Sequence, residues 1–478
     1  MTKPKHLHFV GIKGVGMTPL AVIAKQAGII VTGSDVADTF ITDETLARAG
    51  ITPFIGFSQS HVGRDVDLVI ATGAHGGQEN VEVQEAKSRG IPVLMKGEAV
   101  GEYMQGGILG RSFSGISVAG SHGKTTTTAM IATIFATAGM SPSFLTGTSS
   151  ITPLGASGAL GDGNYFIAEA DEYATDPKHD RTPQFLWQHP EIAVFTNIEL
   201  DHPDIYADVA AVEEAFCVFA NNLPSTGLLI GCGDDARVSE IMARRKGRSI
   251  TYGMGTGNDY TVSAVTQTAD GVSFRLGSKP EGHKQFCLSV FGEHNCFNAT
   301  AAIIVAREAG LETEQIARGL KLFKGAKRRM ERVGTLPSGA LLYDDYAHHP
   351  TEIEKTLSAL RTHFPDKKIV CIFQPHTASR TKKLFNEFCE ALSGADEIIL
   401  APIYASKREE EDTSISSNML ADCLTARGNK AQALPAFEAI REHLAQESYG
   451  LDTIIITVGA GDIYKLQDKL CYAQHHAK

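Results

Sequence analysis

Residues 115–139, "GISVAGSHGKTTTTAMIATIFATAG", decide the fold of the middle of this chain. An apolar run leads into a glycine-containing loop and then into a helical stretch, which is the context of a phosphate-binding loop. The common pattern G-x-x-x-x-G-K-[ST] would start at position 118, where the sequence has Val118. Here a shorter G-x-x-G-K-T occupies residues 120–125. The stretch is a damaged nucleotide site, a chance run of small residues or a different kind of loop, and the spacing alone leaves these alternatives open.

The residues of this loop predict ATP binding. Because Lys124 follows the glycines at a helix start, its ammonium is expected to reach the β- and γ-phosphates, and Thr125 can offer a hydroxyl to Mg²⁺. The alternative is a helix start capped by threonine hydroxyls, with Lys124 in solvent. The expected ATP contacts in the loop are Gly120, Ser121, His122, Gly123, Lys124, Thr125 and Thr126.

Size and composition limit the class of protein. At roughly 100–200 residues per domain, 478 residues predict about three domains. A net charge of −11 argues against a nucleic-acid-binding surface. The eight cysteines form no C-x-x-C and are expected to be reduced thiols. No signal peptide and no apolar run of about 18 residues is present, so we expect a cytoplasmic protein without a membrane partner.

Strands alternating with helices predict an α/β fold with three domains. Residues 1–110 form an expected Rossmann-like domain, residues 111–325 a central P-loop-type ATPase domain with a small antiparallel insertion from Asp259, and residues 326–478 a second Rossmann-like domain. The strands of the last domain are expected at "ALLYDDY", "KKIVCIFQP", "DEIILAP" and "TIIITVGAG".

The first domain opens with "HLHFVGIKGVGM", residues 6–17. Its glycines follow G-x-x-G-x-G, which differs from the dinucleotide fingerprint G-x-G-x-x-G. A glycine turn before a helix still suits a pyrophosphate, because free N–H groups face the ligand there. Asp35, at the end of the next strand, can bind ribose hydroxyls. The alternative is that these glycines only make a tight turn.

Polar residues follow the strands of the central domain. "EADE" holds Glu169, Asp171 and Glu172, and "NIELDH" holds Asn197, Glu199, Asp201 and His202. Carboxylates and an imidazole at neighbouring strand ends can hold a divalent metal beside a triphosphate, although a structural role for His202 is the alternative. Asn295 and Asn298 lie three apart and share a helix face, which suits the edge of an adenine or, alternatively, a helix cap.

The last domain carries a second group of polar residues. "KRR" at 327–329 is either a solvated charge run or a group that reaches the transferred phosphate when domains close. "YDDYAHHPTEI" and "FQPHTASRT" follow consecutive strands, so their side chains are expected at one rim. Arg380 can bind a carboxylate bidentately, which predicts capture of an amino acid. The residues expected at this rim are Asp345, Tyr346, His348, His376 and Arg380.

Taken together and in order along the whole chain, these motifs resemble the Mur ligase family. Members are ATP-dependent enzymes that add amino acids to the UDP-sugar precursor of peptidoglycan. The carriers of the resemblance are "HFVGIKGVGM", "GSHGKTTTT", "EADE", "TNIELDH", "GEHNCFNA", "KRRMERVG", "DDYAHHPTEI" and "FQPHTASRT". The resemblance implies domains for the UDP-substrate, for ATP and for the incoming amino acid.

By motif match, the resemblance implies a role for each candidate residue. Catalysis would depend on Lys124, His202, Arg329 and His348, with Arg329 on phosphate. Thr125, Glu169 and His202 would bind magnesium, expected as two ions. Asn295 and Asn298 would face adenine and Asp345 the ATP ribose, while Tyr346, His348, His376 and Arg380 would handle the amino acid. The UDP part would contact Gly11, Gly14, Val15, Gly16, Met17, Ser34 and Asp35.

The implied substrates are UDP-N-acetylmuramate, ATP and L-alanine, and the implied assembly is a monomer or homodimer. The sequence departs from the alanine-adding branch at Lys13 and Pro19, at "TGAHGGQEN" (72–80) and at the long "DEYATDPKHDRTPQFLWQHP" (171–190). The long segment looks more like a branch that attaches a recycled tripeptide, so a tripeptide acceptor remains the alternative. A nucleotide-regulated binding protein leaves the C-terminal motifs unexplained, and a dinucleotide oxidoreductase leaves the phosphate loop unexplained.

Overall fold

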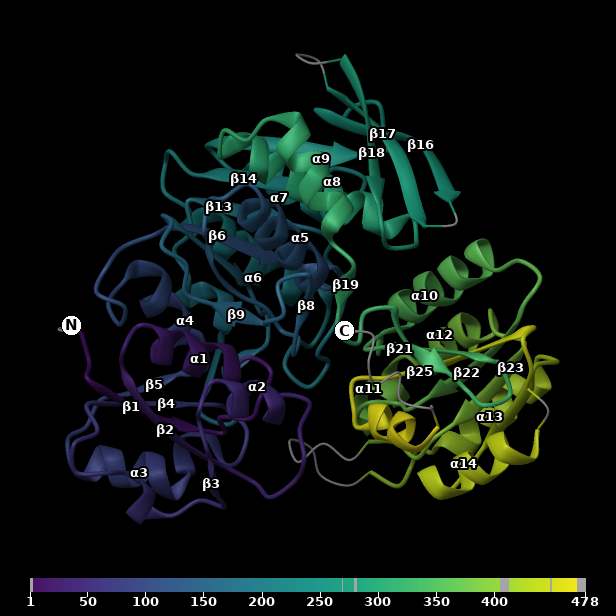
Figure 1. Cartoon of the computed structure of the whole chain (residues 1–478), viewed down its shortest axis with the longest axis horizontal. Helices are drawn as coiled ribbons and strands as arrows, with labels where there is room; N and C mark the ends of the chain where they lie inside the picture. The colour runs from purple at the N-terminus through teal and green to yellow at the C-terminus, as the bar shows by residue number, and fades with distance from the viewer. Residues whose placement is uncertain (1–2, 269, 279–281, 405–411, 448, 471–478) are drawn as a thin grey trace.

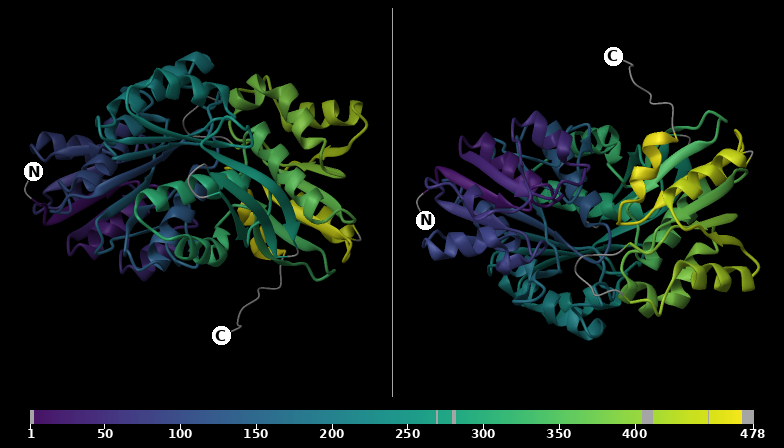
Figure 2. Two further views of the ribbon diagram at one scale, coloured as in Figure 1. Left: turned by 90° about the horizontal axis from the view of Figure 1, so that it is seen from above. Right: turned by 90° about the horizontal axis from the view of Figure 1, so that it is seen from below.

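The computed structural model describes residues 3–268, 270–278, 282–404, 412–447 and 449–470, which form three α/β domains, each built on one large sheet (Figure 1). Two further two-stranded sheets pair β8 (Ile151–Thr152) with β19 (Gly325–Ala326) and β11 (Ala174–Asp176) with β12 (Asp180–Pro183). In both views of Figure 2 the N-terminal and C-terminal domains lie at opposite ends of the molecule, with parts of the middle domain between them. The ends of the first and last expected domains, residues 1–2 and 471–478, lie outside the described residues.

The N-terminal domain is a parallel five-stranded sheet in the order β3-β2-β1-β4-β5. β3 is a two-residue edge strand that no pattern in the sequence indicated. Because all strands are parallel, the loops after β1, β2 and β4 meet at one rim. The strands are β1 (His6–Val10), β2 (Ile30–Asp35), β3 (Phe54–Ile55), β4 (Leu68–Ala71) and β5 (Val93–Met95), and the helices are α1 (Thr18–Gln26), α2 (Asp43–Arg48), α3 (Val81–Ser88) and α4 (Lys96–Gln105).

The middle domain has a mixed ten-stranded sheet in the order β18-β17-β16-β15-β14-β13-β6-β10-β7-β9. The expected antiparallel insertion is β16 to β18, and it extends this sheet. The strands are β6 (Ser114–Ala119), β7 (Ser143–Leu145), β9 (Gly158–Ala159), β10 (Tyr165–Glu169), β13 (Ile192–Phe195), β14 (Leu228–Cys232), β15 (Arg248–Gly253), β16 (Tyr260–Thr268), β17 (Gly271–Ser278) and β18 (Gly282–Leu288). The helices are α5 (Lys124–Thr137), α6 (Val209–Asn222), α7 (Ala236–Arg244), α8 (His294–Glu308) and α9 (Thr313–Leu322).

Helix α5 begins at Lys124, immediately after the glycine loop, and most of it is buried against the sheet and α8. Its threonines tolerate burial because their hydroxyls bond within the protein. Thr128 donates to the Lys124 carbonyl at 2.8 Å and Thr133 to the Ala129 carbonyl at 2.8 Å. The buried helix α5 therefore fixes the phosphate loop at the end of strand β6.

The C-terminal domain has a six-stranded sheet in the order β20-β21-β25-β22-β23-β24, parallel except for β20. β21, β22, β23 and β25 match the four expected strands, whereas the edge strands β20 and β24 were not indicated. The strands are β20 (Glu331–Thr335), β21 (Leu341–Asp345), β22 (Lys368–Phe373), β23 (Glu397–Leu400), β24 (Lys430–Ala433) and β25 (Thr453–Val458). The helices are α10 (Pro350–His363), α11 (Ala378–Lys383), α12 (Phe385–Leu392), α13 (Ser417–Ala426) and α14 (Phe437–Gln446).

The chain passes from the middle to the C-terminal domain between Lys327 and Arg328. The Lys327 carbonyl accepts a bond from Thr148 of the middle domain at 2.9 Å. Arg328 is buried and bonds to Asp344 of the C-terminal domain at 2.9 Å. Its φ of 60° lies in the left-handed region, which is unusual for a side chain of this size. The "KRR" run is therefore not a solvated charge run as a whole.

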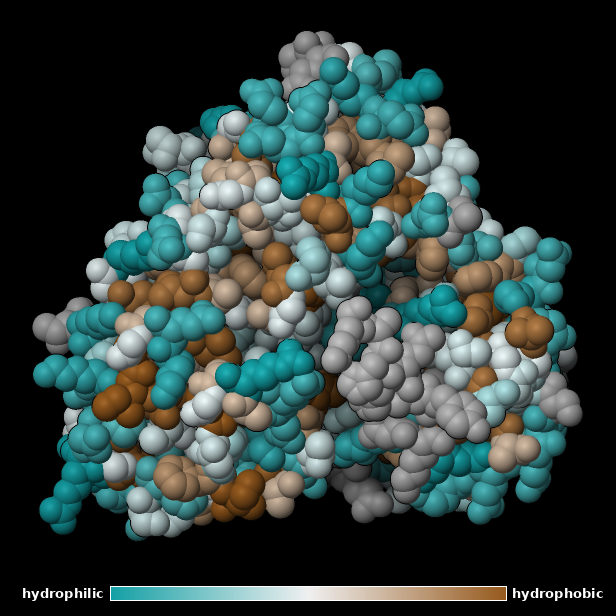
Figure 3. Space-filling view, in the orientation of Figure 1, coloured by the Kyte–Doolittle hydropathy of each residue, from teal (hydrophilic) through white to brown (hydrophobic). Residues whose placement is uncertain are grey.

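The surface in Figure 3 is mostly hydrophilic, with hydrophobic residues in small patches. The exposed large apolar side chains include Ile55, Met254 and Leu451, which belong to different domains. No helix among the described residues combines the length and apolarity that a membrane crossing requires. The large apolar side chains are mostly used in the cores of the three domains.

Candidate active site

The two glycines of the phosphate loop are required by close contacts. Gly120 and Gly123 have φ values of 140° and 83°, in the region that favours glycine. A Cβ on Gly120 would lie 1.9 Å from Thr196 Oγ1, and one on Gly123 would lie 2.5 Å from Asn298 Oδ1. The loop therefore packs closely against the end of β13 and against α8 at its two glycines.

Lys124 points across the loop and is held by a buried carboxylate. Its Nζ donates to the Ser121 carbonyl at 3.1 Å and lies 2.9 Å from Glu172 Oε2. Burial alone would lower the pKa of Lys124, but the Glu172 and Asp171 carboxylates raise it above its ordinary value. The ammonium is therefore charged and oriented, as binding of a phosphate requires.

Three side chains beside Lys124 form a group that can hold a metal ion: Glu172, Asp201 and His202, whose ligand atoms lie within 4.8 Å of one another. Their carboxylate oxygens are ligands that Mg²⁺ prefers, and the imidazole is a less usual addition. Glu172 and Asp201 are among the carboxylates named in the quoted motifs, but the ligands predicted for the metal from sequence are Thr125, Glu169 and His202. Glu169 lies near this group, and its carboxylate accepts the Gly147 N–H at 2.6 Å.

Residues of all three domains line one cavity of about 280 Å³ that includes the phosphate loop. The N-terminal domain brings its glycine turn, and the C-terminal domain brings the residues after β21. Among its lining residues are Val15, Gly16, Lys96, Lys124, Thr125, Glu169, Asp171, His202, Arg329, Tyr346, His348 and Glu352. The structure thus brings together much of the set predicted from sequence, and this cavity is the candidate active site.

Arg329 reaches the phosphate loop from the start of the C-terminal domain. Its Nη2 donates to Thr125 Oγ1 at 3.0 Å, and its guanidinium stacks over Tyr346 at 4.9 Å from the ring centre. Asp345, one residue before Tyr346, accepts the N–H groups of Met330 and Ala347 at 2.8 and 2.7 Å. Because burial outweighs these bonds, the pKa of Asp345 rises to about 6.

The two C-terminal motifs meet at one rim, as the sequence predicted. The rings of His348 and His376 are 6.1 Å apart, and Arg380 Nη1 lies 3.3 Å from His376 Nδ1. Arg380 is only 3% exposed and donates to Asp201 of the middle domain at 2.6 Å. Burial lowers the pKa of His348 to about 4, so its ring is neutral at neutral pH.

Other predicted residues are engaged inside their own domains. Asn295 donates to the Phe291 carbonyl at 2.6 Å, and Asn298 donates to Asn295 at 3.0 Å. The Ser34 hydroxyl donates to buried Glu82, and Asp35 accepts the Lys13 N–H at 2.8 Å. Gly11 and Gly14 form the turn before α1, and Met17 lies in the N-terminal core. The adenine and UDP contacts expected of these residues remain predictions.

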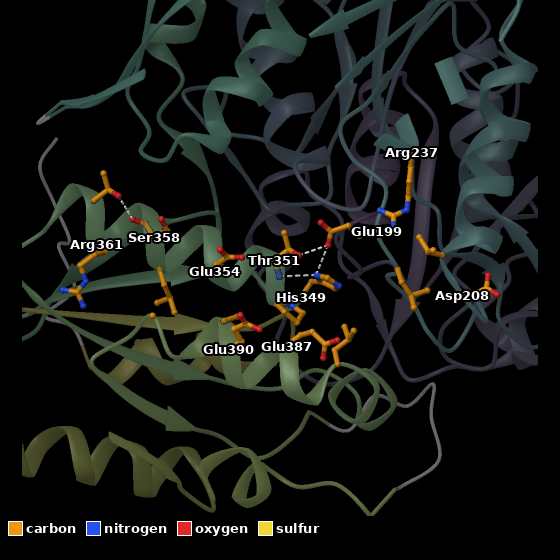
Figure 4. A pocket seen from close by; sticks show the side chains of 18 residues that line it. Glu199, Asp208, Arg237, His349, Thr351, Glu354, Ser358, Arg361, Glu387 and Glu390 are labelled. Atoms are coloured by element: carbon orange, nitrogen blue, oxygen red, sulfur yellow. Dashed lines mark hydrogen bonds and ion pairs between the residues drawn. The ribbon is translucent and has the colours of Figure 1, made fainter. Parts of the chain in front are cut away.

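A larger cavity of about 1060 Å³ lies between the middle and C-terminal domains (Figure 4). Of the candidate residues named from the sequence, Glu199 lines it, whereas Lys124, His202 and Arg329 line the smaller cavity. Glu199 at its edge accepts a bond from Thr351 at 2.7 Å and lies 3.5 Å from His349 Nδ1. His122 of the phosphate loop lies 3.3 Å from Glu199 and 3.2 Å from Glu352 of the C-terminal domain. We define His122, Glu199, His349 and Glu352 as the interdomain ion-pair network.

This network predicts a pH dependence of domain closure. Burial would lower the pKa of His122, but Glu352 and Glu199 raise it to about 10 from 6.5. Protonated His122 therefore contributes fully to the stability of the closed arrangement below pH 6.5. This contribution is lost as the pH rises through 10. Burial would raise the pKa of Glu199, but His122 lowers it to about 2 from 4.5, so its contribution is complete above pH 4.5. Burial lowers the pKa of His349 below 6.5, so its contribution is complete above pH 6.5 and is lost at lower pH, and the closed arrangement should be most stable near pH 6.5.

Small-angle X-ray scattering can measure this prediction as the radius of gyration. The radius should increase between pH 6.5 and pH 10. The variant Glu199→Gln should flatten the dependence because it removes one anion facing His122. Glu387→Gln, which lines the same cavity without belonging to the network, is the matched control. A radius that does not change over this range would contradict the prediction.

A phosphate loop that shares its cavity with two further α/β domains defines a nucleotide-dependent enzyme that works between domains. Family models match the three domains in turn: "Mur ligase family, catalytic domain" at residues 6–107, "Mur ligase middle domain" at 118–306 and "Mur ligase, glutamate ligase domain" at 328–461. The chain belongs to the Mur ligase family, and it is an ATP-dependent acid–amino acid ligase.

Individual relatives cover the whole chain. The chain is 40% identical to a UDP-N-acetylmuramate–L-alanine ligase of Desulfitobacterium hafniense, over 98% of this chain and 99% of the relative. A crystal structure of the UDP-N-acetylmuramate–alanine ligase MurC from Thermotoga maritima is similar, with a TM-score of 0.79, 26% identity and 97% of each chain covered. A murein peptide ligase from Psychrobacter arcticus has a TM-score of 0.71 and 26% identity, with 98% of each chain covered.

Proposed function

We propose that this protein is a UDP-N-acetylmuramate–L-alanine ligase that acts in peptidoglycan precursor synthesis. The observation that carries the proposal is the 40% identity to an enzyme of that name over the length of both chains. The cavity supports it, because the phosphate loop, Arg329 and His348 lie around one space. The domain roles follow: UDP-substrate binding by residues 1–110, ATP binding by 111–325 and amino-acid binding by 326–478.

The proposed reaction has two steps. The muramyl carboxylate attacks the γ-phosphate of ATP, giving an acyl phosphate and ADP. The amine of L-alanine then attacks the acyl carbon, giving the amide and phosphate. Lys124 and Arg329 supply fixed positive charge near the phosphate loop, where charge develops in the first step. Mg²⁺, held by the group around His202, would neutralise further phosphate charge when bound.

The second step needs a proton acceptor, because only a neutral amine attacks. His348 fits this role since burial keeps its ring neutral at neutral pH. The carboxylates of Asp201 and Glu352 lie 4.0 and 3.3 Å from its nitrogens and would stabilise the imidazolium. His376 is the second candidate on the same rim. Closure of the C-terminal domain over the phosphate loop would keep water from the acyl phosphate.

The acceptor can be tested directly by mass spectrometry. Purified protein is offered UDP-N-acetylmuramate and ATP with either L-alanine or the tripeptide L-Ala-γ-D-Glu-meso-diaminopimelate. We expect the mass of the alanyl product and phosphate release that requires both UDP-sugar and alanine. Product only with the tripeptide would support the murein-peptide ligase alternative, which the long segment after Glu172 favours. Phosphate release without either acceptor would contradict both.

We further infer a cytoplasmic enzyme that works as a monomer or homodimer with these three small substrates. The UDP-sugar and ATP are intracellular metabolites, and the composition indicates neither a nucleic-acid nor a membrane partner. Sedimentation of the purified protein would give the oligomeric state.

A further inference from the structure

Two stretches that the sequence sets apart from the alanine-adding branch lie against each other in the structure. One is the loop at residues 72–80, which follows β4 in the N-terminal domain. The other is a hairpin within the long segment of the middle domain, formed by β11 (Ala174–Asp176) and β12 (Asp180–Pro183). Their contact crosses the boundary between the domain proposed to bind the UDP-sugar and the domain with the phosphate loop.

Asp176 is the centre of this contact and is only 1% exposed. Its Oδ2 accepts the backbone N–H of Gln78 across the domain boundary at 2.9 Å. His179 lies 3.3 Å from the same oxygen, and its other nitrogen lies 3.4 Å from Glu79 Oε1. A buried carboxylate without its partners is costly, so the hairpin and the loop favour one relative position.

Two glycines of the loop are required by the hairpin. A Cβ on Gly77 would lie 2.3 Å from Asp176 Oδ2, and a Cβ on Gly73 would lie 2.8 Å from the Thr175 carbonyl oxygen. A side chain at either position would force the loop or the hairpin to shift. The glycines of "TGAHGGQEN" and the hairpin are therefore parts of one contact.

The same loop also touches the proposed nucleotide site. His75 Nε2 lies 3.5 Å from Asp35 Oδ1, the carboxylate expected to bind ribose. A Cβ on Gly11, in the glycine turn, would lie 2.4 Å from the Thr72 side chain and 3.5 Å from the His75 ring. A displacement of the loop at residues 72–80 would therefore also displace the glycine turn at Gly11 and the side chain of Asp35.

The hairpin segment borders the reaction centre at its other side. Tyr173, Ala174, Pro177 and Gln184 line the cavity that contains Lys124. The Tyr173 ring lies 4.7 Å from the His202 ring, and its hydroxyl donates to Asp204 at 2.7 Å. One continuous set of contacts thus runs from Asp35 through the loop and hairpin to His202.

We propose that residues 174–183 and the loop at 72–80 form an interdomain clasp that aligns the UDP-sugar site with the reaction centre, with Asp176 as its positioning residue. The inference rests on the proposed function, because it assigns the UDP-sugar to the N-terminal domain. The clasp acts on the UDP-sugar and leaves ATP binding, which depends on the phosphate loop, largely unchanged.

The test measures binding by calorimetry, for UDP-N-acetylmuramate and for ATP separately. Asp176→Asn should raise the Kd for the UDP-sugar about tenfold, because it removes a charge-assisted bond across the boundary, and should change the Kd for ATP by less than about twofold. Asp180→Asn is the matched control, since the Asp180 carboxylate bonds to Thr182 within the hairpin.

A second variant tests the contact independently of the carboxylate. Gly77→Ala should also weaken UDP-sugar binding, because its Cβ would meet Asp176. Gly90→Ala controls for backbone strain, since Gly90 has a φ of 71° in the same domain and open space around it. Thermal unfolding of each variant checks that it is folded.

The outcomes separate the clasp from the proposed function. Unchanged UDP-sugar binding by folded Asp176→Asn and Gly77→Ala would overturn the clasp while product formation by the unmodified protein still supports the ligase. An equal loss of ATP and UDP-sugar affinity would also overturn it, because the effect would then be general. An unmodified protein that binds UDP-N-acetylmuramate but forms no product would contradict the function and leave the clasp supported.

Discussion

Replacing Lys124 with alanine should reduce turnover about 10²- to 10³-fold, the usual loss when one group that stabilises developing charge is removed. The ammonium is already oriented in the loop by Ser121 and Glu172, so little reorganisation opposes its contact with phosphate. Phosphate release with all three substrates at saturation measures the effect. Lys124→Met should give the same result, because it keeps the length of the side chain and removes only the charge.

Two comparisons separate this catalytic effect from loss of structure. Lys25→Ala changes an exposed lysine at the end of α1 and should leave turnover unchanged. Removing Lys124 also leaves Glu172 buried without its cation, so the melting temperature should fall. Adding Glu172→Gln to Lys124→Ala should restore part of the melting temperature without restoring turnover. Near-normal turnover of folded Lys124→Ala would refute its role at the phosphates.

Replacing Arg380 with alanine should raise the KM for L-alanine by roughly 10- to 100-fold, the range for loss of a charged hydrogen-bonding partner. Arg380 is buried beside His376 on the rim proposed for the amino acid. The planar guanidinium of Arg380 can donate two parallel N–H hydrogen bonds to a carboxylate. In the structure it already donates to the carboxylate of Asp201. Initial rates over a range of alanine concentrations, with ATP and UDP-sugar saturating, give the KM.

Lys383→Ala provides the matched control for Arg380. Lys383 is a second cation of α11 that crosses to the middle domain, where it donates to the Ala207 carbonyl at 3.0 Å. If Arg380 served only to hold the domains together, the two variants should behave alike. We expect Lys383→Ala to leave the KM for alanine near its normal value. An unchanged KM in Arg380→Ala would exclude this residue from the amino-acid site.

The sequence predicts the parallel strands well because burial on both faces makes them apolar runs. β1, β6, β22 and β25 are fully or almost fully buried and stand out for that reason. Strands at sheet edges do not have this signal. β3 has two exposed residues and β24 has none that is fully buried, so their pairing depends on neighbours that sequence periodicity does not reveal.

The candidate site divides in a similar way. Lys124, Thr125 and Arg329 are indicated by their place relative to a glycine loop or a domain boundary, and the structure brings them together. Glu172 and Asp201 were inside quoted motifs, yet several neighbouring carboxylates competed for the metal role. The partner of Arg380 was beyond prediction, because Asp201 is distant in sequence and belongs to another domain. Spacing indicates local geometry, whereas contacts between domains depend on how the domains pack.

The chain passes between two domains at Lys327 and Arg328, and the position of this junction bears on when bound ATP could be hydrolysed. Arg329 stands on the C-terminal side of this junction, but it bonds to Thr125 of the phosphate loop. If the C-terminal domain swings away, it takes Arg329 with it, and an open molecule holds ATP without this cation. Under the proposed function, Arg329 would meet the phosphates only in the state that also presents the proposed amino-acid rim, and this would disfavour hydrolysis of ATP without amide formation.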